Sequence, residues 1–291
     1  MPTGIVLLDK PEGLSSNGAL QRVRRLLGAA KAGHAGSLDP LATGMLPICL
    51  DEATKIAGEI LSSRKRYRFT IELGVRTATG DREGEVVERC DVPELTAGRL
   101  EAVLAGFLGP GRQVPPMYSA LKREGRPLYE LARSGVVVER QARPIEIFGL
   151  RLLGWQGGRV EIETHCSKGT YVRTLAEDIA RELGTCGHVA ALRRSSVEPF
   201  DREPMQTLQS IALACERGEA PGILPADWPL KHLPAAHLSA LQAGRVRHGQ
   251  PVQVGGANAI AGKVRLYEEA RFLGIGEADG RGSVRPKRLF A

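Results

Sequence analysis

The sequence is poor in aromatic residues and lacks the short motifs that hold nucleotide cofactors. Phe, Trp and Tyr make up only 4% of its 291 residues, so each aromatic residue among polar neighbours has to be considered separately. Neither a G-x-G-x-x-G fingerprint nor a P-loop is present. Since those glycine-rich loops place nucleotide phosphates at a helix N-terminus, their absence argues against a nucleotide-cofactor enzyme.

The cysteines form no recognisable framework. They are scattered, odd in number and without a C-x-x-C pair: Cys49, Cys90, Cys166, Cys186 and Cys215. This pattern argues against a disulfide framework and against a zinc site. We therefore expect no metal and a reducing compartment.

The chain also lacks a long hydrophobic run at its start. The apolar stretch GIVLLDKPEG is interrupted by Asp9 and Lys10, so it predicts neither a signal peptide nor a membrane span. We expect a cytoplasmic protein with no membrane contact.

Apolar residues and basic charge are both plentiful. Hydrophobic residues reach 42% of the chain, which is enough for a core, and 40 Lys and Arg residues against 33 acidic ones give a net charge of +7. A basic surplus favours polyanionic partners, chiefly nucleic acid. The alternative is a soluble protein that happens to be basic.

The periodicity of the apolar residues predicts mixed helices and strands. Strands are expected at 4–10, 66–75 and 188–200, with a hairpin over 143–167 that turns at Gly157 and Gly158. Helices are expected at 17–29, 51–63, 95–109 and 169–184. Because no regular βαβ repeat appears, we predict an α+β fold with a mixed or antiparallel sheet flanked by helices.

A proline-rich segment at 224–234 divides the chain. We predict a main domain at 1–230 and a small β domain at 231–291. Within the main domain, residues from about 110 to 140 are rich in proline, tyrosine and basic residues. This stretch predicts an exposed insertion.

One glycine-rich loop contains a single carboxylate in a restrained backbone. In GHAGSLDPLATG (33–44), Pro40 restrains Asp39 away from the helical region, while three glycines permit close backbone approaches. Such a loop can present a fixed carboxylate to a bulky ligand. An ordinary Asp-Pro turn is the alternative.

Several stretches, in order along the chain, resemble the TruB-type tRNA pseudouridine synthases, which isomerise uridine 55 in the T arm. They are LLDKPEGLSSN (7–17), GHAGSLDPLATGMLPICL (33–50), KRYRFTIELGVRTATGDREG (65–84), VPPMYSALKREGRPLYELARSG (114–135), CSKGTYVRTLAEDIARELG (166–184) and HVAALRRSSV (188–197). Two departures stand in the second stretch, where Ala35 and Ser37 replace residues that are often threonine in the family. Both are small and leave the aspartate unchanged.

The resemblance implies an isomerase that uses one carboxylate. Pseudouridine formation breaks the N1–C1′ bond, turns the base and joins C5 to C1′, with no redox change and no group lost, so we expect no cofactor. Asp39 would be the nucleophile, and Arg173 of GTYVRT would pair with it. Tyr67 would stack on the base and take part in proton transfer. Without the resemblance, the sequence would predict that Tyr67 is a strand residue packed in the core and that Arg173 is a solvated arginine.

The resemblance also implies the walls of a base pocket and an RNA grip. Tyr171 and Leu192 would wall the pocket, and His34 would fill the stack that a flipped base leaves. The basic residues of the insertion would form a thumb that contacts RNA: Lys122, Arg123 and Arg126. The alternative for the insertion is a solvated, charged helix. The C-terminal module resembles a PUA-like domain, expected to touch RNA near the acceptor end.

The partner implied is the T arm of tRNA. Two alternatives stay open at this point: an RNA chaperone that only binds, and the guide-RNA-dependent branch of the superfamily, which needs partner proteins. The chain has no obvious extra partner-binding extension or lysine-rich tail. We therefore expect a monomer that needs neither a guide RNA nor an obligatory protein partner.

Overall fold

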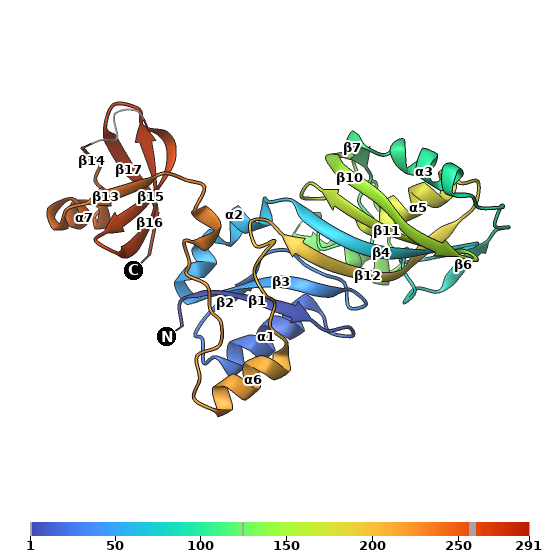
Figure 1. Cartoon of the computed structure of the whole chain (residues 1–291), viewed down its shortest axis with the longest axis horizontal. Helices are drawn as coiled ribbons and strands as arrows, with labels where there is room; N and C mark the ends of the chain where they lie inside the picture. The colour runs from blue at the N-terminus through green and yellow to red at the C-terminus, as the bar shows by residue number, and fades with distance from the viewer. Residues whose placement is uncertain (1, 124, 256–259, 291) are drawn as a thin grey trace.

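An eight-stranded sheet forms the centre of the main domain in the computed structural model, which describes residues 2–123, 125–255 and 260–290 (Figure 1). The strands follow the order β1-β3-β12-β4-β11-β10-β7, and β2 pairs with β3 beside that path. Among the described strands of this sheet, only β3 and β12 pair in parallel. The bounds are β1 (Gly4–Lys10), β2 (Ala32–His34), β3 (Thr43–Leu50), β4 (Lys65–Leu73), β7 (Gly109–Gln113), β10 (Arg143–Gln156), β11 (Arg159–Cys166) and β12 (Gly187–Val197).

Four helices pack against the sheet and share one apolar core with it: α1 (Ser16–Leu26), α3 (Ala97–Ala105), α5 (Val172–Glu182) and α6 (Leu208–Glu216). Polar residues begin three of them. The side chains of Ser15, Thr96 and Thr207 accept backbone N–H groups at the first turns of α1, α3 and α6. These caps satisfy donors that a helix start leaves without intrahelical partners.

The predicted α+β class with a mixed sheet is confirmed, and the differences are local. The helix expected at 51–63 is a 3-10 helix, η1 (Asp51–Ile56), followed by a short helix, α2 (Ala57–Leu61). The apolar periodicity predicted neither β3 nor α6. β3 is buried along nearly its whole length, so it lacks the alternation that marks a half-buried strand.

The cysteine pattern argued against a disulfide framework, yet one pair does form a bridge. Cys90 and Cys186 are bonded, with their Cα atoms 5.8 Å apart and a sequence separation of 96. The fold brings them together at Gly74, whose N–H donates to Cys186 O and whose carbonyl accepts from Cys90 N. Spacing alone does not predict such a contact. Cys90 follows β6 (Val86–Arg89), which pairs with β5 (Val75–Thr77).

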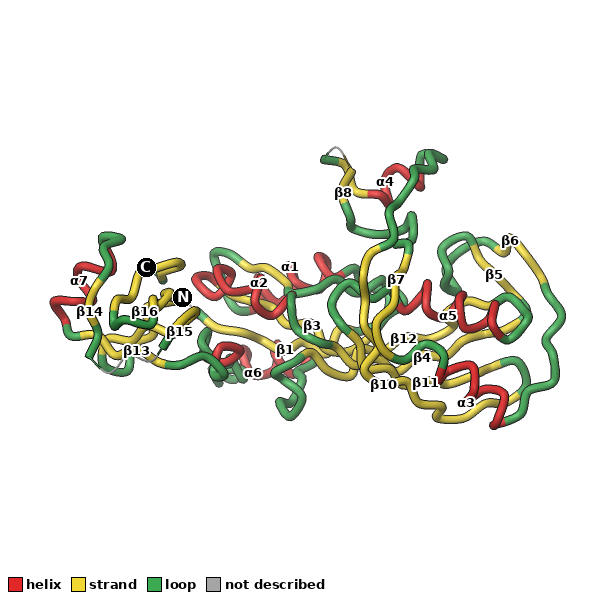
Figure 2. Tube along the Cα trace, turned by 90° about the horizontal axis from the view of Figure 1, so that it is seen from above, coloured by secondary structure: helices red, strands yellow, loops and turns green. Residues whose placement is uncertain are grey.

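The predicted insertion projects from the sheet between β7 and β10 (Figure 2). It contains a short hairpin, β8 (Lys122–Arg123) and β9 (Arg126–Pro127), and one short helix, α4 (Leu128–Arg133). We call residues 114–135 the thumb.

A second sheet of five strands makes up the C-terminal module, in the order β13-β15-β16-β17-β14. The strands and the single helix packed on them are β13 (Ala235–Leu238), α7 (Ala240–Arg247), β14 (Val252–Gln253), β15 (Ala261–Glu268), β16 (Arg271–Asp279) and β17 (Ser283–Leu289). A further cluster joins the module to the main domain, since Ile275 and Phe272 pack with Ile56, Ile60 and the segment η2 (Trp228–Leu230). The boundary at 230/231 stays a prediction.

Candidate active site

The Asp39 loop is fastened at both ends. Ser16 at the start of α1 both donates from Oγ to Leu38 O (2.9 Å) and accepts from Leu38 N (2.7 Å). Gly44 has φ +98, and a Cβ there would lie 2.2 Å from Arg194 O. Glycine is therefore required where the loop enters β3, because a side chain would collide with the backbone of β12.

Asp39 and Arg173 form the ion pair that the resemblance implied. Arg173 stands in the first turn of α5, and its Nε lies 3.0 Å from Asp39 Oδ2, while Nη2 donates to Oδ1 at 3.3 Å. The arginine side chain is 6% exposed and the aspartate side chain 37% exposed. The carboxylate therefore opens to solvent on one side, while its cation is held inside the protein.

Two carbonyl groups and a second carboxylate fix the arginine. Nη1 donates to Thr79 O (2.8 Å), and Nη2 donates to Tyr118 O (2.6 Å). Asp81 Oδ2 lies 3.7 Å from Nη1. Asp81 is buried, and the sequence analysis gave it no role, although the turn TATGDREG contains it. Arg173 thus stands between two acidic groups.

Partial burial raises the pKa of the Asp39 carboxyl above its ordinary value. Loss of hydration is the main cause, the charge of Asp81 adds to it, and Arg173 and Lys10 oppose it. Because more than a third of the side chain stays exposed and two guanidinium nitrogens contact it, we expect the carboxylate to be ionised at neutral pH.

Lys10 supports the Asp39 loop through hydrogen bonds to backbone carbonyls. Its side chain is fully buried, and Nζ donates to Leu14 O (2.6 Å), Pro11 O (2.9 Å) and Pro40 O (3.3 Å). Burial lowers the pKa of this ammonium to about 8. The contacts support a bracing function rather than a reacting one.

The residues predicted as pocket walls lie on three elements: β4, β12 and the segment before α5. Tyr67 on β4 is partly buried against the main core, and Leu192 on β12 is buried in it. Tyr171 precedes α5 and is held there by Gln113, whose side chain bonds both its N–H and its carbonyl. Burial raises the pKa of both phenols, and the charge of Asp39 adds to the rise in each. Both rings therefore lie within electrostatic reach of Asp39.

His34 ends the short strand β2, directly before the loop. Its Nδ1 is buried and has no hydrogen-bond partner among the residues that the structure describes, and burial lowers the pKa of the ring. A neutral imidazole can stack on a base and can also accept a proton. The stack-filling role expected for His34 stays a prediction.

The structure places the basic residues predicted to grip RNA on the thumb. Lys122 and Arg126 are exposed on the projecting hairpin, and Arg123 lies beside them in β8 (Figure 2). The base of the thumb does reach the site, since Tyr118 supplies a carbonyl to Arg173. The thumb and Arg173 are thus in direct contact.

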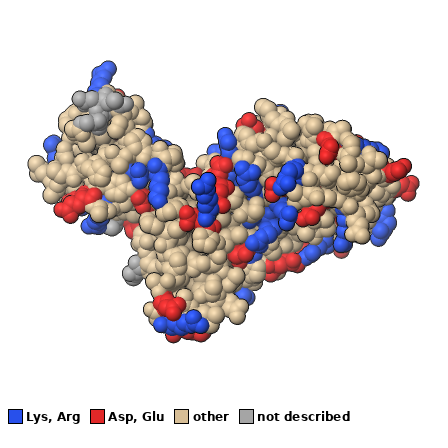
Figure 3. All heavy atoms as spheres, in the orientation of Figure 1, with Lys and Arg blue, Asp and Glu red and all other residues tan. Residues whose placement is uncertain are grey.

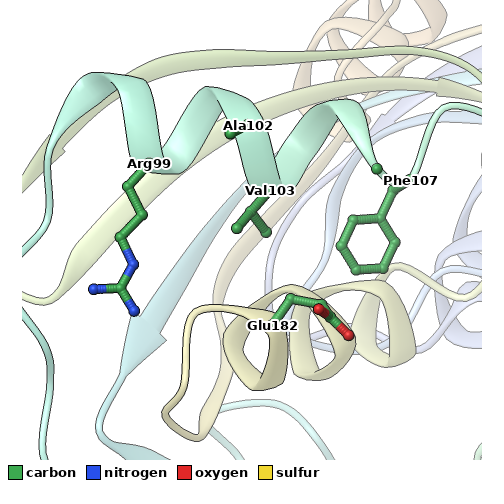
Figure 4. A pocket seen from close by; sticks show the side chains of 6 residues that line it. Arg99, Ala102, Val103, Phe107 and Glu182 are labelled. Carbon is green, nitrogen blue, oxygen red and sulfur yellow. The ribbon is translucent and has the colours of Figure 1, made fainter.

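A separate groove of about 550 Å³ lies between α3 and α5, lined by Arg99, Val103, Phe107 and Glu182, among others (Figure 4). It contains none of the predicted site residues. Within the described residues, no group of three or more His, Cys, Asp or Glu side chains could hold a metal ion, and no helix could cross a membrane.

Family models match nearly the whole chain. Residues 24–172 match "TruB family pseudouridylate synthase (N terminal domain)", residues 173–231 match "tRNA pseudouridylate synthase B C-terminal domain", and residues 234–290 match "Pseudouridine synthase II TruB, C-terminal". The chain belongs to the TruB family.

Curated relatives agree with this membership. A tRNA pseudouridine synthase B from Hydrogenovibrio crunogenus is 49% identical over 289 residues, which cover 99% of this chain and 93% of the relative. One from Aromatoleum aromaticum is 49% identical over 288 residues, covering 99% and 92%. Both alignments span the C-terminal module as well as the TruB core.

A solved structure shares the fold. The crystal structure of a Cbf5-Nop10-Gar1 complex contains a chain that is 23% identical, with a TM-score of 0.74, covering 99% of this chain and 85% of that one. At this identity the likeness concerns the fold alone.

Proposed function

We propose that this TruB-family protein isomerises uridine 55 in the T arm of tRNA to pseudouridine, with Asp39 as the nucleophile. The observation that carries the proposal is the contact between Asp39 and the buried Arg173, in a chain that matches tRNA pseudouridine synthases over its whole length. A buried arginine keeps a carboxylate ionised where hydration is reduced.

The chemistry requires few groups. Attack by the carboxylate divides the exchange of the N1–C1′ bond for a C5–C1′ bond into easier steps. C5 loses a proton and N1 gains one, so atoms and electrons balance without a further reactant. Tyr67, Tyr171 and Leu192 offer aromatic and aliphatic surfaces to the base, which has to leave its stack to reach Asp39.

The thumb and the C-terminal module would hold the rest of the RNA. Lys122, Arg123 and Arg126 stand on an exposed hairpin, where basic side chains can contact phosphates. We assign the PUA-like module a contact near the acceptor end. Its tight packing on the main domain would keep the two RNA-binding regions at a fixed separation.

A stand-alone tRNA enzyme is favoured over the two alternatives. An RNA chaperone has no need of an ion-paired carboxylate, and its binding surface alone would not require Asp39. The guide-RNA branch is disfavoured because curated relatives at 49% identity are named tRNA pseudouridine synthase B. The Cbf5 likeness extends only to the fold.

Release of tritium from an unmodified T-arm stem-loop, labelled at C5 of uridine, tests the proposal. Formation of the C5–C1′ bond sends that tritium to water. We expect release by the wild type and none by Asp39→Asn, which should still fold and bind the stem-loop. Turnover by Asp39→Asn would remove Asp39 as the nucleophile. Tight binding without release by the wild type would favour the chaperone or a partner-dependent enzyme.

A further inference from the structure

Arg194 on β12 is a buried cation with an unusual environment. Its side chain is 1% exposed, and within the described residues it forms no salt bridge to a carboxylate. Its guanidinium is solvated by backbone carbonyls instead: Nε donates to Met45 O (2.7 Å), Nη2 to Gly36 O (3.0 Å) and Nη1 to Ser37 O (3.3 Å). A buried charge without a counter-ion is unfavourable for folding, so its presence calls for a reason.

The three carbonyls lie on both sides of the nucleophile. Gly36 and Ser37 precede Asp39, and Met45 follows it at the start of β3. The planar guanidinium therefore joins the entry and the exit of the Asp39 loop with one rigid group. The backbone continues this contact, because Arg194 O fills the space where Gly44 would otherwise carry a Cβ.

Arg194 also adjoins the strand that carries Tyr67. It is the cross-strand partner of Tyr67 in the antiparallel β4–β12 ladder and of Gly44 in the parallel β3–β12 pairing. One residue thus borders both the nucleophile loop and the tyrosine strand. Its positive charge also opposes the rise in the pKa of Tyr67 that burial causes.

We propose that Arg194 is a positioning residue for the isomerase reaction, which fixes Asp39 relative to Tyr67 by clamping both ends of the 36–45 loop to β12. This inference rests on the proposed function. It does not require Arg194 to touch the substrate. Misplacement of a reacting group by about 1 Å lowers a rate on the order of 100-fold, so loss of the clamp should act on catalysis rather than on RNA binding.

The test uses two variants and a matched control in the full chain. Arg194→Met keeps an unbranched, flexible apolar stem and removes the guanidinium that forms the clamp. Arg194→Lys keeps a cation, but a single ammonium group cannot reproduce the planar fork that serves Met45, Gly36 and Ser37. The control is Arg68→Met, an exposed arginine on the adjacent strand β4, where it pairs with Glu161.

Two quantities are measured beside the melting temperature: the dissociation constant for the T-arm stem-loop, and the single-turnover rate of tritium release at saturating enzyme. For Arg194→Met we expect a rate about 100-fold lower with a dissociation constant within about threefold of the wild type. Arg194→Lys should fold more stably than Arg194→Met and still lose at least about tenfold in rate. Arg68→Met should match the wild type.

Each other result has a definite meaning. Folded Arg194 variants that react at the wild-type rate would overturn the inference, as would a rate loss explained wholly by weaker binding. Failure of both variants to fold would assign Arg194 to fold stability alone and would also overturn it. An inactive wild type would instead refute the proposed function, so the two failures are distinguishable.

Discussion

Arg173 serves two acidic side chains of unequal burial. Asp39 is the more exposed and receives the shorter contact, 3.0 Å, whereas the buried Asp81 lies 3.7 Å away. The same guanidinium also donates to two backbone carbonyls, of Thr79 and Tyr118. At the scale of single residues, the ionisation of Asp39 thus depends chiefly on Arg173, whose position is fixed from several sides.

The pH profile should reveal this dependence. Arg173 opposes the rise in the pKa of Asp39, so its removal in Arg173→Met should raise that pKa further. Only the ionised carboxylate attacks, so activity is lost as pH falls through the pKa, and the acidic limb should move to higher pH. At neutral pH we expect a rate at least about 100-fold lower, since both charge and placement are lost.

Single-turnover rates measured from about pH 5 to 8 would check the shift. Arg181→Met is a suitable control, because Arg181 is an exposed arginine at the other end of α5 that pairs with Asp178. An acidic limb that stays in place in Arg173→Met would mean that the arginine does not govern the ionisation of Asp39.

The antiparallel pair β5–β6 is the element whose connecting turn contacts Arg173. Its turn carries Thr79 and Asp81, and the disulfide at Cys90 fastens its far end to the start of β12. Local hydrogen bonds at Gly74 secure the same junction. Part of the active-site geometry therefore depends on a covalent link between distant segments.

Removing the disulfide should lower stability. A bridge that spans 96 residues is expected to contribute about 2–4 kcal/mol to the free energy of unfolding. The midpoint of guanidinium unfolding of the wild type should move to a lower denaturant concentration when a thiol reductant is added. Cys90→Ser should unfold at that lower concentration with or without the reductant. Cys215→Ser, which removes an unbonded thiol, should keep the response of the wild type. Identical unfolding in both redox states would mean that the bridge adds no stability.

Much of the architecture can be predicted from residues close together in sequence. The features that cannot be predicted in this way depend on tertiary contacts. Capping at Ser15 and Thr96, the hairpin at Gly157 and the helix α5 follow from residues close in sequence. The family motifs pointed to Asp39 and Arg173, which the structure brings together.

Asp81, Arg194 and the disulfide were overlooked for physical reasons. A buried arginine solvated by backbone carbonyls has no side-chain partner that a motif could reveal. A bridge over 96 residues depends on how strands meet. The thumb contact of Tyr118 with Arg173 is a backbone interaction, which residue types do not encode.

At the scale of the whole molecule, positive charge is spread over the surface among acidic groups. Figure 3 shows Lys and Arg side chains gathered across the middle of one face, interspersed with Asp and Glu. Several exposed pairs, including Arg68–Glu161 and Arg151–Glu163, neutralise one another. The net charge of +7 remains as a general attraction for RNA.

Binding should therefore weaken as salt rises. Counter-ions released from RNA by basic side chains make the logarithm of the affinity fall linearly with the logarithm of the salt concentration. Filter binding of the T-arm stem-loop between about 50 and 200 mM salt would check this. An affinity that does not change with salt would contradict a thumb that contacts phosphates.

The depth of Arg173 and Arg194 has a consequence for the medium in which the enzyme works. Mobile ions screen charges at the surface far more than charges inside a protein. Both guanidinium groups lie inside, at 6% and 1% exposed. Ionic strength should therefore govern how often RNA binds, while the reaction rate of the bound complex stays nearly constant. A salt series at saturating enzyme would then separate binding from chemistry without any mutation.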